Sequence, residues 1–240
     1  MDLKEVYWCS RLSTERHRIV ARLPKDSVLC DMFCGVGPLS IQAAKFKNCR
    51  VLANDLNPAC AKYLEKNIKL NHLKHKILPF NMDAREFVKM IVIENKVSPE
   101  YAHFDNVYMN LPVDAVEFLD VFCGLFAKGD KKVWNENNLP MIYVYAFTDQ
   151  EKEEEAKVAL CKRINLIFNK YKPLAIDDII DFYQIRDVSA KSRMYSIAFK
   201  LSKEVAYGIE MGEGAEIKIP KKHSSEGEIP QSENKKKKFE

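Results

Sequence analysis

Four polar residues stand where successive βα units would end their strands. Asp31, Asp55, Asp83 and Asn110 each come at or just after a short apolar run, and they lie 24, 28 and 27 residues apart. Each spacing has about the length of one strand, one helix and their connections. Because ligands bind at the carboxyl ends of the strands in an open α/β sheet, we expect these side chains to line one pocket.

A glycine turn follows the first of these acids. Gly35 and Gly37 come shortly after Asp31, and glycine lets the backbone turn tightly and approach a ligand closely. The turn lacks the third glycine of the dinucleotide fingerprint, and the chain lacks the GxxxxGKS/T pattern of a P-loop. Pyrophosphate binding is therefore disfavoured. A cofactor with a ribose but no phosphate fits better, and S-adenosylmethionine is the common one.

The next two acids have the chemistry to bind a nucleoside. Asp55 could accept hydrogen bonds from both ribose hydroxyls, as a carboxylate can and a lysine or alanine cannot. Asp83 could accept from an adenine amino group while the backbone N–H of Ala84 meets a ring nitrogen. Helix capping is the alternative for each residue, ahead of Pro58 for Asp55 and at the start of residues 85–93 for Asp83.

Alternating strand and helix patterns must position these residues. Apolar runs predict strands, and amphipathic periodicity predicts a helix after each of the first five. The last two strands have no helix between them, which indicates a terminal antiparallel hairpin. We expect an α/β fold with a doubly wound, mostly parallel, seven-stranded sheet. The predicted strands are 27–32, 50–54, 76–80, 105–110, 139–147, 182–188 and 194–201, and the predicted helices are 38–46, 57–71, 84–93, 112–126 and 151–171.

Composition sets further bounds. The chain has 240 residues, 47% hydrophobic and 30% charged, which suits one globular domain and excludes wholesale disorder. Its net charge of +4 is compatible with a nucleic-acid partner without requiring one. We expect a catalytic domain over residues 1–206 and a disordered tail, rich in lysine and glutamate, over 207–240. No apolar run is long enough to span a membrane, and no targeting peptide is visible.

The seven cysteines show no paired framework, which suits a reducing compartment. Cys30 and Cys34 have CxxxC spacing, but a radical iron–sulfur motif would need a third cysteine where Gly37 stands. We interpret these thiols as buried side chains around a strand end, and we expect no metal site.

Four segments together resemble a known family. They are residues 6–16 (Val-Tyr-Trp-Cys-Ser-Arg-Leu-Ser-Thr-Glu-Arg), 31–38 (Asp-Met-Phe-Cys-Gly-Val-Gly-Pro), 54–58 (Asn-Asp-Leu-Asn-Pro) and 109–112 (Met-Asn-Leu-Pro). The combination is similar to the eukaryotic and archaeal tRNA (guanine-N1) methyltransferases that act at guanosine-37, beside the anticodon. The resemblance runs from about residue 6 to residue 201, including the terminal hairpin.

The resemblance implies a class I, Rossmann-like methyltransferase that uses S-adenosylmethionine and acts on the anticodon stem-loop of tRNA. We expect the chain to be a monomer. It assigns Glu15 as general base, and Asn110 and Pro112 to the motif that frames the target base. The residues expected at the cofactor are Arg16, Phe33, Gly35, Asp55, Leu56, Asp83, Ala84 and Asn110. The chain departs from the family at Cys9-Ser10, where Asn-Pro is usual, and at Cys34, where a small alanine is usual.

The chemistry of guanine agrees with this assignment. Guanine N1 carries a proton at neutral pH, so its attack on a sulfonium methyl needs a positioned base, and the guanine must leave its stack to reach the methyl. Glu15 could supply that base. The alternative is a surface acid on a short helix, paired with Arg11, Arg18 or Arg22.

Three functions stay open from the sequence. Methyl transfer to guanosine-37 of tRNA is favoured. The related wybutosine-pathway enzyme, which transfers an aminocarboxypropyl group, is disfavoured by Asn110-Leu111-Pro112, and a non-catalytic, cofactor-binding remnant acting as a partner module is the third. Family members carry upstream tRNA-binding domains that this chain is expected to lack, which would impair activity on full tRNA. We expect residence in the cytoplasm, the nucleus or the mitochondrial matrix, away from membranes.

Overall fold

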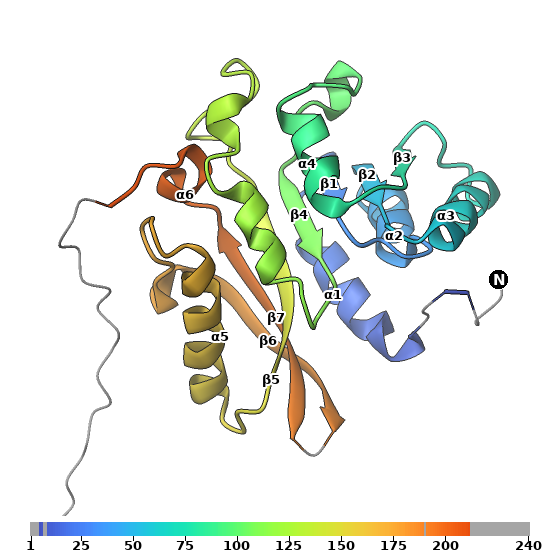
Figure 1. The fold of residues 1–240 in the computed structure, drawn as a ribbon. Helices are drawn as coiled ribbons and strands as arrows, with labels where there is room; N and C mark the ends of the chain where they lie inside the picture. Colours follow the sequence, from blue (N-terminus) through green and yellow to red (C-terminus); the bar gives the residue numbers. More distant parts are fainter. Residues whose placement is uncertain (1–4, 7–8, 190, 212–240) are drawn as a thin grey trace, which may run out of the picture.

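Seven strands form one sheet in a computed structural model that describes residues 5–6, 9–189 and 191–211 (Figure 1). The strand order is β3-β2-β1-β4-β5-β7-β6. Strands β1 to β5 pair in parallel, and β7 runs antiparallel to both β5 and β6. The strands are β1 (Val28–Asp31), β2 (Arg50–Asn54), β3 (Ile77–Phe80), β4 (Asn106–Met109), β5 (Met141–Thr148), β6 (Ile179–Ser189) and β7 (Ser192–Lys200). The predicted mostly parallel sheet with its terminal hairpin is confirmed.

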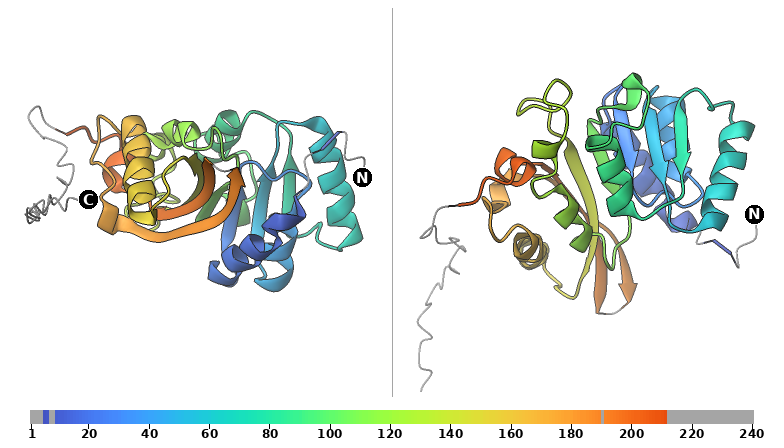
Figure 2. Two further views of the ribbon diagram at one scale, coloured as in Figure 1. Left: turned by 90° about the horizontal axis from the view of Figure 1, so that it is seen from below. Right: turned by 45° about the horizontal axis from the view of Figure 1, so that its top comes forward.

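Helices cover both faces of the sheet, as the view from below shows (Figure 2). Because side chains alternate along a strand, Leu29 and Tyr108 face α1, α2 and α3, whereas Cys30 and Val107 face α4 and α5. Two apolar cores therefore sandwich the sheet. The helices are α1 (Ser13–Arg22), α2 (Pro38–Phe46), α3 (Pro58–Leu70), α4 (Ala84–Val92), α5 (Glu153–Ile167) and α6 (Lys203–Tyr207).

Local sequence explains where α3 begins. The side chain of Asn57 accepts a hydrogen bond from the backbone N–H of Ala59 at 2.9 Å, and Pro58 takes the first helical position, where its missing N–H costs nothing. Leu64 and Ile68, four residues apart, are buried against the sheet. The loop that follows β2 is thereby held at the carboxyl edge of the sheet.

The prediction of a helix over residues 112–126 is wrong. The chain there forms turns and two short 3-10 helices, η3 (Glu117–Phe122) and η4 (Phe126–Lys128). Most of its local hydrogen bonds reach back three residues, as from the N–H of Leu119 to the carbonyl of Val116 at 3.1 Å. Gly124 then interrupts the segment at a φ of +69°, and its N–H donates to the carbonyl of Val205 at 2.8 Å. Contact with α6 thus overrides the helical periodicity.

The carboxyl-terminal elements differ from expectation mainly at their bounds. Helix α5 is shorter than predicted, because the side chain of Asn165 binds both the N–H and the carbonyl of Leu174 and turns the chain back after the helix. The described structure continues past the expected domain boundary at residue 206, where the N–H of Met211 donates to the carbonyl of Lys170 at 3.0 Å. Most of the predicted tail, residues 212–240, lies outside the described residues.

Candidate functional site

A pocket of about 560 Å³ opens at the carboxyl edge of the parallel strands. It extends from the loops after β2 and β3 to the end of β6. Nine residues that the sequence assigned to the site line it: Arg16, Phe33, Gly35, Asp55, Leu56, Asp83, Ala84, Asn110 and Pro112. Their convergence follows from the parallel topology, which carries the end of each strand to one edge.

The glycine turn after β1 forms one wall of this pocket. Gly35 has a φ of +56° and Gly37 a φ of +84°, values that glycine adopts readily and other residues rarely do. A Cβ atom added to Gly35 would meet nothing within 4 Å, so the backbone there borders open space. A Cβ added to Gly37 would instead collide with the side chain of Leu64. The first glycine therefore leaves room for a ligand, and the second lets α3 pack closely.

Asp55 is fixed at the pocket edge by two backbone donors. Its Oδ2 accepts from the N–H of Gly35 at 2.8 Å and its Oδ1 from the N–H of Asn57 at 2.9 Å. Asn57, rather than Asp55, caps α3, so the capping alternative for Asp55 is wrong. Each carboxylate oxygen has a second lone pair with which it can accept from a ligand hydroxyl.

Asp83 caps a helix and lines the pocket as well. Its Oδ1 accepts from the N–H groups of Arg85 at 2.9 Å and Glu86 at 3.3 Å, at the start of α4. The capping alternative is thus confirmed, and it leaves Oδ2 for a ligand donor, such as an amino group. Phe33 and Phe118 meet edge to face nearby, with ring centroids 5.0 Å apart, and give this part of the pocket an apolar wall.

Asp31 does not line the pocket, contrary to the expectation for all four strand-end groups. It is fully buried beneath it, where its Oδ2 accepts from the hydroxyl of Ser40 at 2.6 Å. Burial raises the pKa of Asp31 to about 7, the hydrogen bond from Ser40 opposes the rise, and the charge of Asp55 adds to it. Asp31 therefore supports the turn from below.

Asn110-Leu111-Pro112 crosses the middle of the pocket, directly after β4. The carbonyl of Pro112 accepts from the N–H of Phe147 at 3.3 Å, which ties this segment to β5. Val113, the next residue, lines the mouth and is 61% exposed. Asn110 can offer one donor and one acceptor group to a bound molecule.

Glu15 lies outside the pocket wall, although its neighbour Arg16 lines it. Its side chain is only 3% exposed, and both oxygens are bonded, Oε2 to Arg18 Nε at 2.6 Å and Oε1 to Arg18 Nη2 at 2.9 Å. The hydroxyl of Tyr145 also donates to Oε1, at 2.6 Å. The alternative named Arg18 as a partner correctly, but Glu15 is buried, so it is not a surface acid.

Arg18 links this carboxylate to the edge of the sheet. Its Nη1 binds Asp181 of β6 at 2.5 Å, and Arg22 binds the same carboxylate at 2.7 Å. Burial lowers the pKa of Arg18, but the hydrogen bonds with Glu15 and Asp181 outweigh it and raise that pKa above its usual value. The guanidinium also lies 4.2 Å from the ring centroid of Tyr183. Helix α1 is thus held over β5 and β6.

Several lining residues escaped sequence reasoning. Phe147, Arg186 and Met194 come from β5, β6 and β7, far along the chain from the glycine turn. Cys60, a fourth, lies near Asp55, and burial raises the pKa of its thiol to about 11. No local motif marks these positions: the pairing of β5, β7 and β6 reveals the first three, and the placement of α3 beside the pocket reveals Cys60.

Two absences hold for the described part of the chain. None of its histidine, cysteine and acidic side chains gather in a group of three or more that could hold a metal ion. None of its helices combines the length and the apolar character needed to cross a membrane.

The sheet order, the glycine turn and the edge pocket define a Rossmann-like fold of the class I methyltransferase type. Crystal structures share it: the chain aligns with Trm5b from Pyrococcus abyssi at 29% identity and a TM-score of 0.60, covering 84% of this chain and 52% of that one. It aligns with the tRNA m1G37 methyltransferase of M. jannaschii at 27% identity and a TM-score of 0.58, covering 85% of this chain and 53% of that one.

The chain belongs to the TRM5/TYW2 methyltransferase domain family, and the sequence model of that family matches residues 1–131. It is 40% identical to tRNA (guanine(37)-N(1))-methyltransferase 1 of Vitis vinifera, over 86% of this chain and 32% of the relative. It is 36% identical to the tRNA (guanine(37)-N(1))-methyltransferase of Batrachochytrium dendrobatidis, over 86% of this chain and 50% of the relative. The chain thus spans half the length, or less, of these relatives.

Proposed function

We propose that this chain is the catalytic core of an S-adenosylmethionine-dependent methyltransferase that modifies N1 of guanosine-37 in tRNA. The observation that carries the proposal is the single pocket that gathers Arg16, Asp55, Asp83, Asn110 and Pro112 at one edge of the sheet. Relatives named tRNA (guanine(37)-N(1))-methyltransferase support the substrate, as does the structural likeness to Trm5 in its complex with tRNA(Leu), at 27% identity.

The pocket fits the cofactor by the chemistry of its donors and acceptors. Asp55 keeps lone pairs for ribose hydroxyls, and Asp83 with Ala84 can meet the edge of an adenine. The open space beside Gly35 can accommodate the methionine part. When bound, S-adenosylmethionine would supply an electrophilic methyl group. The protein would have to hold the guanine in place and accept its N1 proton.

Glu15 is the proposed acceptor of that proton. Because Glu15 is buried outside the pocket wall and bonded to Arg18 and Tyr145 in this structure, its carboxylate would have to move toward the pocket to meet guanine N1–H. Asn110 and Pro112, in the middle of the pocket, would frame the guanine. Removing the N1 proton as the new bond forms would make the ring nitrogen nucleophilic.

The test is methyl transfer by the purified 240-residue chain from labelled S-adenosylmethionine to unmodified tRNA. A matched tRNA with adenosine at position 37 serves as the control. We expect label in the first tRNA only, in a nucleoside that co-elutes with an N1-methylguanosine standard, since methylguanosine isomers share one mass. Transfer of the aminocarboxypropyl group instead would identify the wybutosine-type reaction. Tight cofactor binding without any transfer to either RNA would favour the non-catalytic module.

A further inference from the structure

Charge is divided between the two ends of the pocket. The lining acids Asp55 and Asp83 follow β2 and β3, on one side of β4. The lining arginines lie toward the other side, Arg186 on the edge strand β6 and Arg16 on α1, which is tied to β5 and β6. Acids accept from hydroxyl and amino groups, whereas guanidinium groups bind anionic oxygens. The second end is therefore built for an anion.

A β-bulge brings Arg186 to this end. Gln184 pairs with Tyr195 and Arg186 with Met194, so Ile185 is an extra residue in β6. The side chain of Gln184 lies on the same face of the sheet as that of Tyr195, whose hydroxyl donates to Gln184 Oε1 at 3.1 Å. Arg186 instead opposes Met194, which in turn opposes Phe147 across β7 and β5. Bulges often redirect a side chain next to a functional site, and here the row Phe147–Met194–Arg186 extends the pocket to the sheet edge.

The guanidinium of Arg186 has no partner among the described residues. Its Nε is buried and makes no hydrogen bond to any of them. The adjacent acid, Asp187, is engaged elsewhere, with Arg193 Nε at 3.5 Å and with the side-chain amide of Gln184 at 2.9 Å. Since a buried donor without an acceptor costs free energy, this arrangement indicates that a ligand supplies the acceptor.

We propose that Arg186 binds a phosphate of the substrate RNA next to the target guanosine and so positions that nucleotide. The inference rests on the proposed function and adds a positioning residue to it. Three strand spacings, about 14 Å, separate β4 from β6. A guanine placed at Asn110 would direct its ribose and phosphate toward this end. The carboxylate of the cofactor is joined to its sulfonium by only a short aliphatic chain. Arg16, which also lines the pocket, would bind that carboxylate and so leave Arg186 for the RNA.

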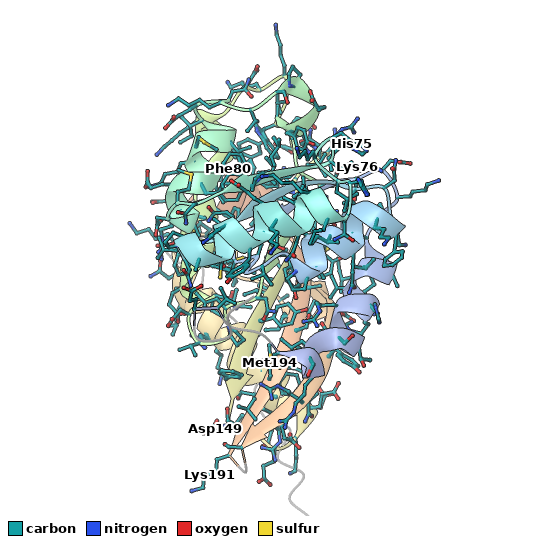
Figure 3. All side chains as sticks on the ribbon, turned by 90° about the vertical axis from the view of Figure 1, so that its right-hand side faces the viewer. His75, Lys76, Phe80, Asp149, Lys191 and Met194 are labelled. Atoms are coloured by element: carbon teal, nitrogen blue, oxygen red, sulfur yellow. The ribbon has the colours of Figure 1, made fainter. Side chains whose placement is uncertain are left out.

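The test compares Arg186→Met and Arg186→Lys with Lys191→Met. Lys191 has the same charge on the same hairpin, but it is exposed at the tip, beyond Met194, and does not line the pocket (Figure 3). The probe is an anticodon stem-loop RNA containing guanosine-37, titrated at several salt concentrations. S-adenosylmethionine affinity is measured by calorimetry, and thermal melting verifies that each variant folds.

We expect Arg186→Met to weaken RNA binding roughly tenfold or more, as for the loss of a hydrogen bond to a charged group. The slope of log affinity against log salt concentration should become shallower by about the amount that one phosphate contact contributes. Arg186→Lys should retain that salt dependence, and Lys191→Met should change neither quantity by more than about twofold. Cofactor affinity should stay within about twofold in all three variants. A loss of cofactor affinity in Arg186→Met with RNA binding intact would overturn the proposal and assign Arg186 to the cofactor's carboxylate.

A second measurement tests the phosphate itself. Two RNAs carry an uncharged methylphosphonate on the 5′ or the 3′ side of guanosine-37. Compared with the unmodified RNA, one of the two should bind the parent protein roughly tenfold more weakly. The same RNA should bind Arg186→Met almost as well as the unmodified RNA does, because that variant already lacks the guanidinium that contacts the phosphate. Equal losses in both proteins would refute the contact. If the parent methylates guanosine-37 and these values do not move, only the role of Arg186 fails; if the parent neither binds nor methylates the RNA, the proposed function fails.

Discussion

The hydroxyl of Tyr145 donates a hydrogen bond of 2.6 Å to Oε1 of Glu15, joining β5 to α1 across 130 residues of chain. Phe147, two residues further along β5, points to the same face and lines the pocket. The proposed base is thus held one step beneath the pocket wall. Burial raises the pKa of the Tyr145 hydroxyl well above its ordinary value, and nearby Tyr108 and Glu15 add to the rise, so the phenol stays protonated as a donor.

Replacing Tyr145 with phenylalanine should therefore destabilise the protein. The change leaves a buried carboxylate oxygen with one fewer donor, which costs about 1–3 kcal/mol of unfolding free energy, measured by urea denaturation. Tyr143→Phe is the matched control, since Tyr143 lies on the same strand and its hydroxyl has no hydrogen bond to a described residue. Equal losses from the two variants would mean that the Tyr145–Glu15 bond contributes nothing specific.

Glu15→Gln should separate chemistry from binding. The amide keeps the size of the side chain and can still accept from Tyr145, but it cannot take a proton. Single-turnover methylation of guanosine-37 should slow roughly 10²–10⁴-fold, whereas cofactor affinity should stay within about twofold. Asp181→Asn is the control, because it also loosens Arg18 but leaves the carboxylate of Glu15 in place. A parent-like rate in Glu15→Gln would assign the proton to another group.

Asp55→Ala should weaken cofactor binding. If the carboxylate accepts from two ribose hydroxyls, its loss removes about 2–4 kcal/mol, on the order of a 30-fold or greater change by calorimetry. The same change also removes the acceptor for the N–H groups of Gly35 and Asn57. Asp55→Asn, which retains one acceptor oxygen, should bind with intermediate affinity. Affinity that stays at the parent value in a folded Asp55→Ala would refute the assignment.

Asp31 should make stability depend on pH. Burial raises its pKa to about 7 in the folded protein, against about 3.9 in an unfolded chain, so the folded state holds a proton that the unfolded state releases between these values. The free energy of unfolding should fall by up to a few kcal/mol as the pH rises from about 4 to 7. Asp31→Asn should flatten this slope, whereas Asp149→Asn, at an exposed carboxylate, should leave it unchanged. A slope that persists in Asp31→Asn would place the titration elsewhere.

Local patterns determined most of the framework. The predicted bounds of β2 and α2 agree with the structure, and those of α3 agree within one residue at each end, because apolar periodicity, the glycine turn before α2 and Pro58 after the cap of α3 act within a few residues. The same patterns located Asp55, Asp83 and Asn110, since the end of each strand in a parallel sheet comes to one edge whatever the details of packing.

Tertiary contacts decided the rest. Residues 112–126 have helical periodicity, but the bond from Gly124 to Val205 outweighs this weak local preference. Asp31 became a buried support, and Glu15 acquired Tyr145 from a strand far along the chain. Arg186 lines the pocket because the β-bulge in β6 turns its side chain to the face of the sheet that carries Met194. The sequence by itself thus determined the elements and the acids at their ends. Which side chains share a pocket, and which are buried beneath it, depended on pairings between distant segments that no local window contains.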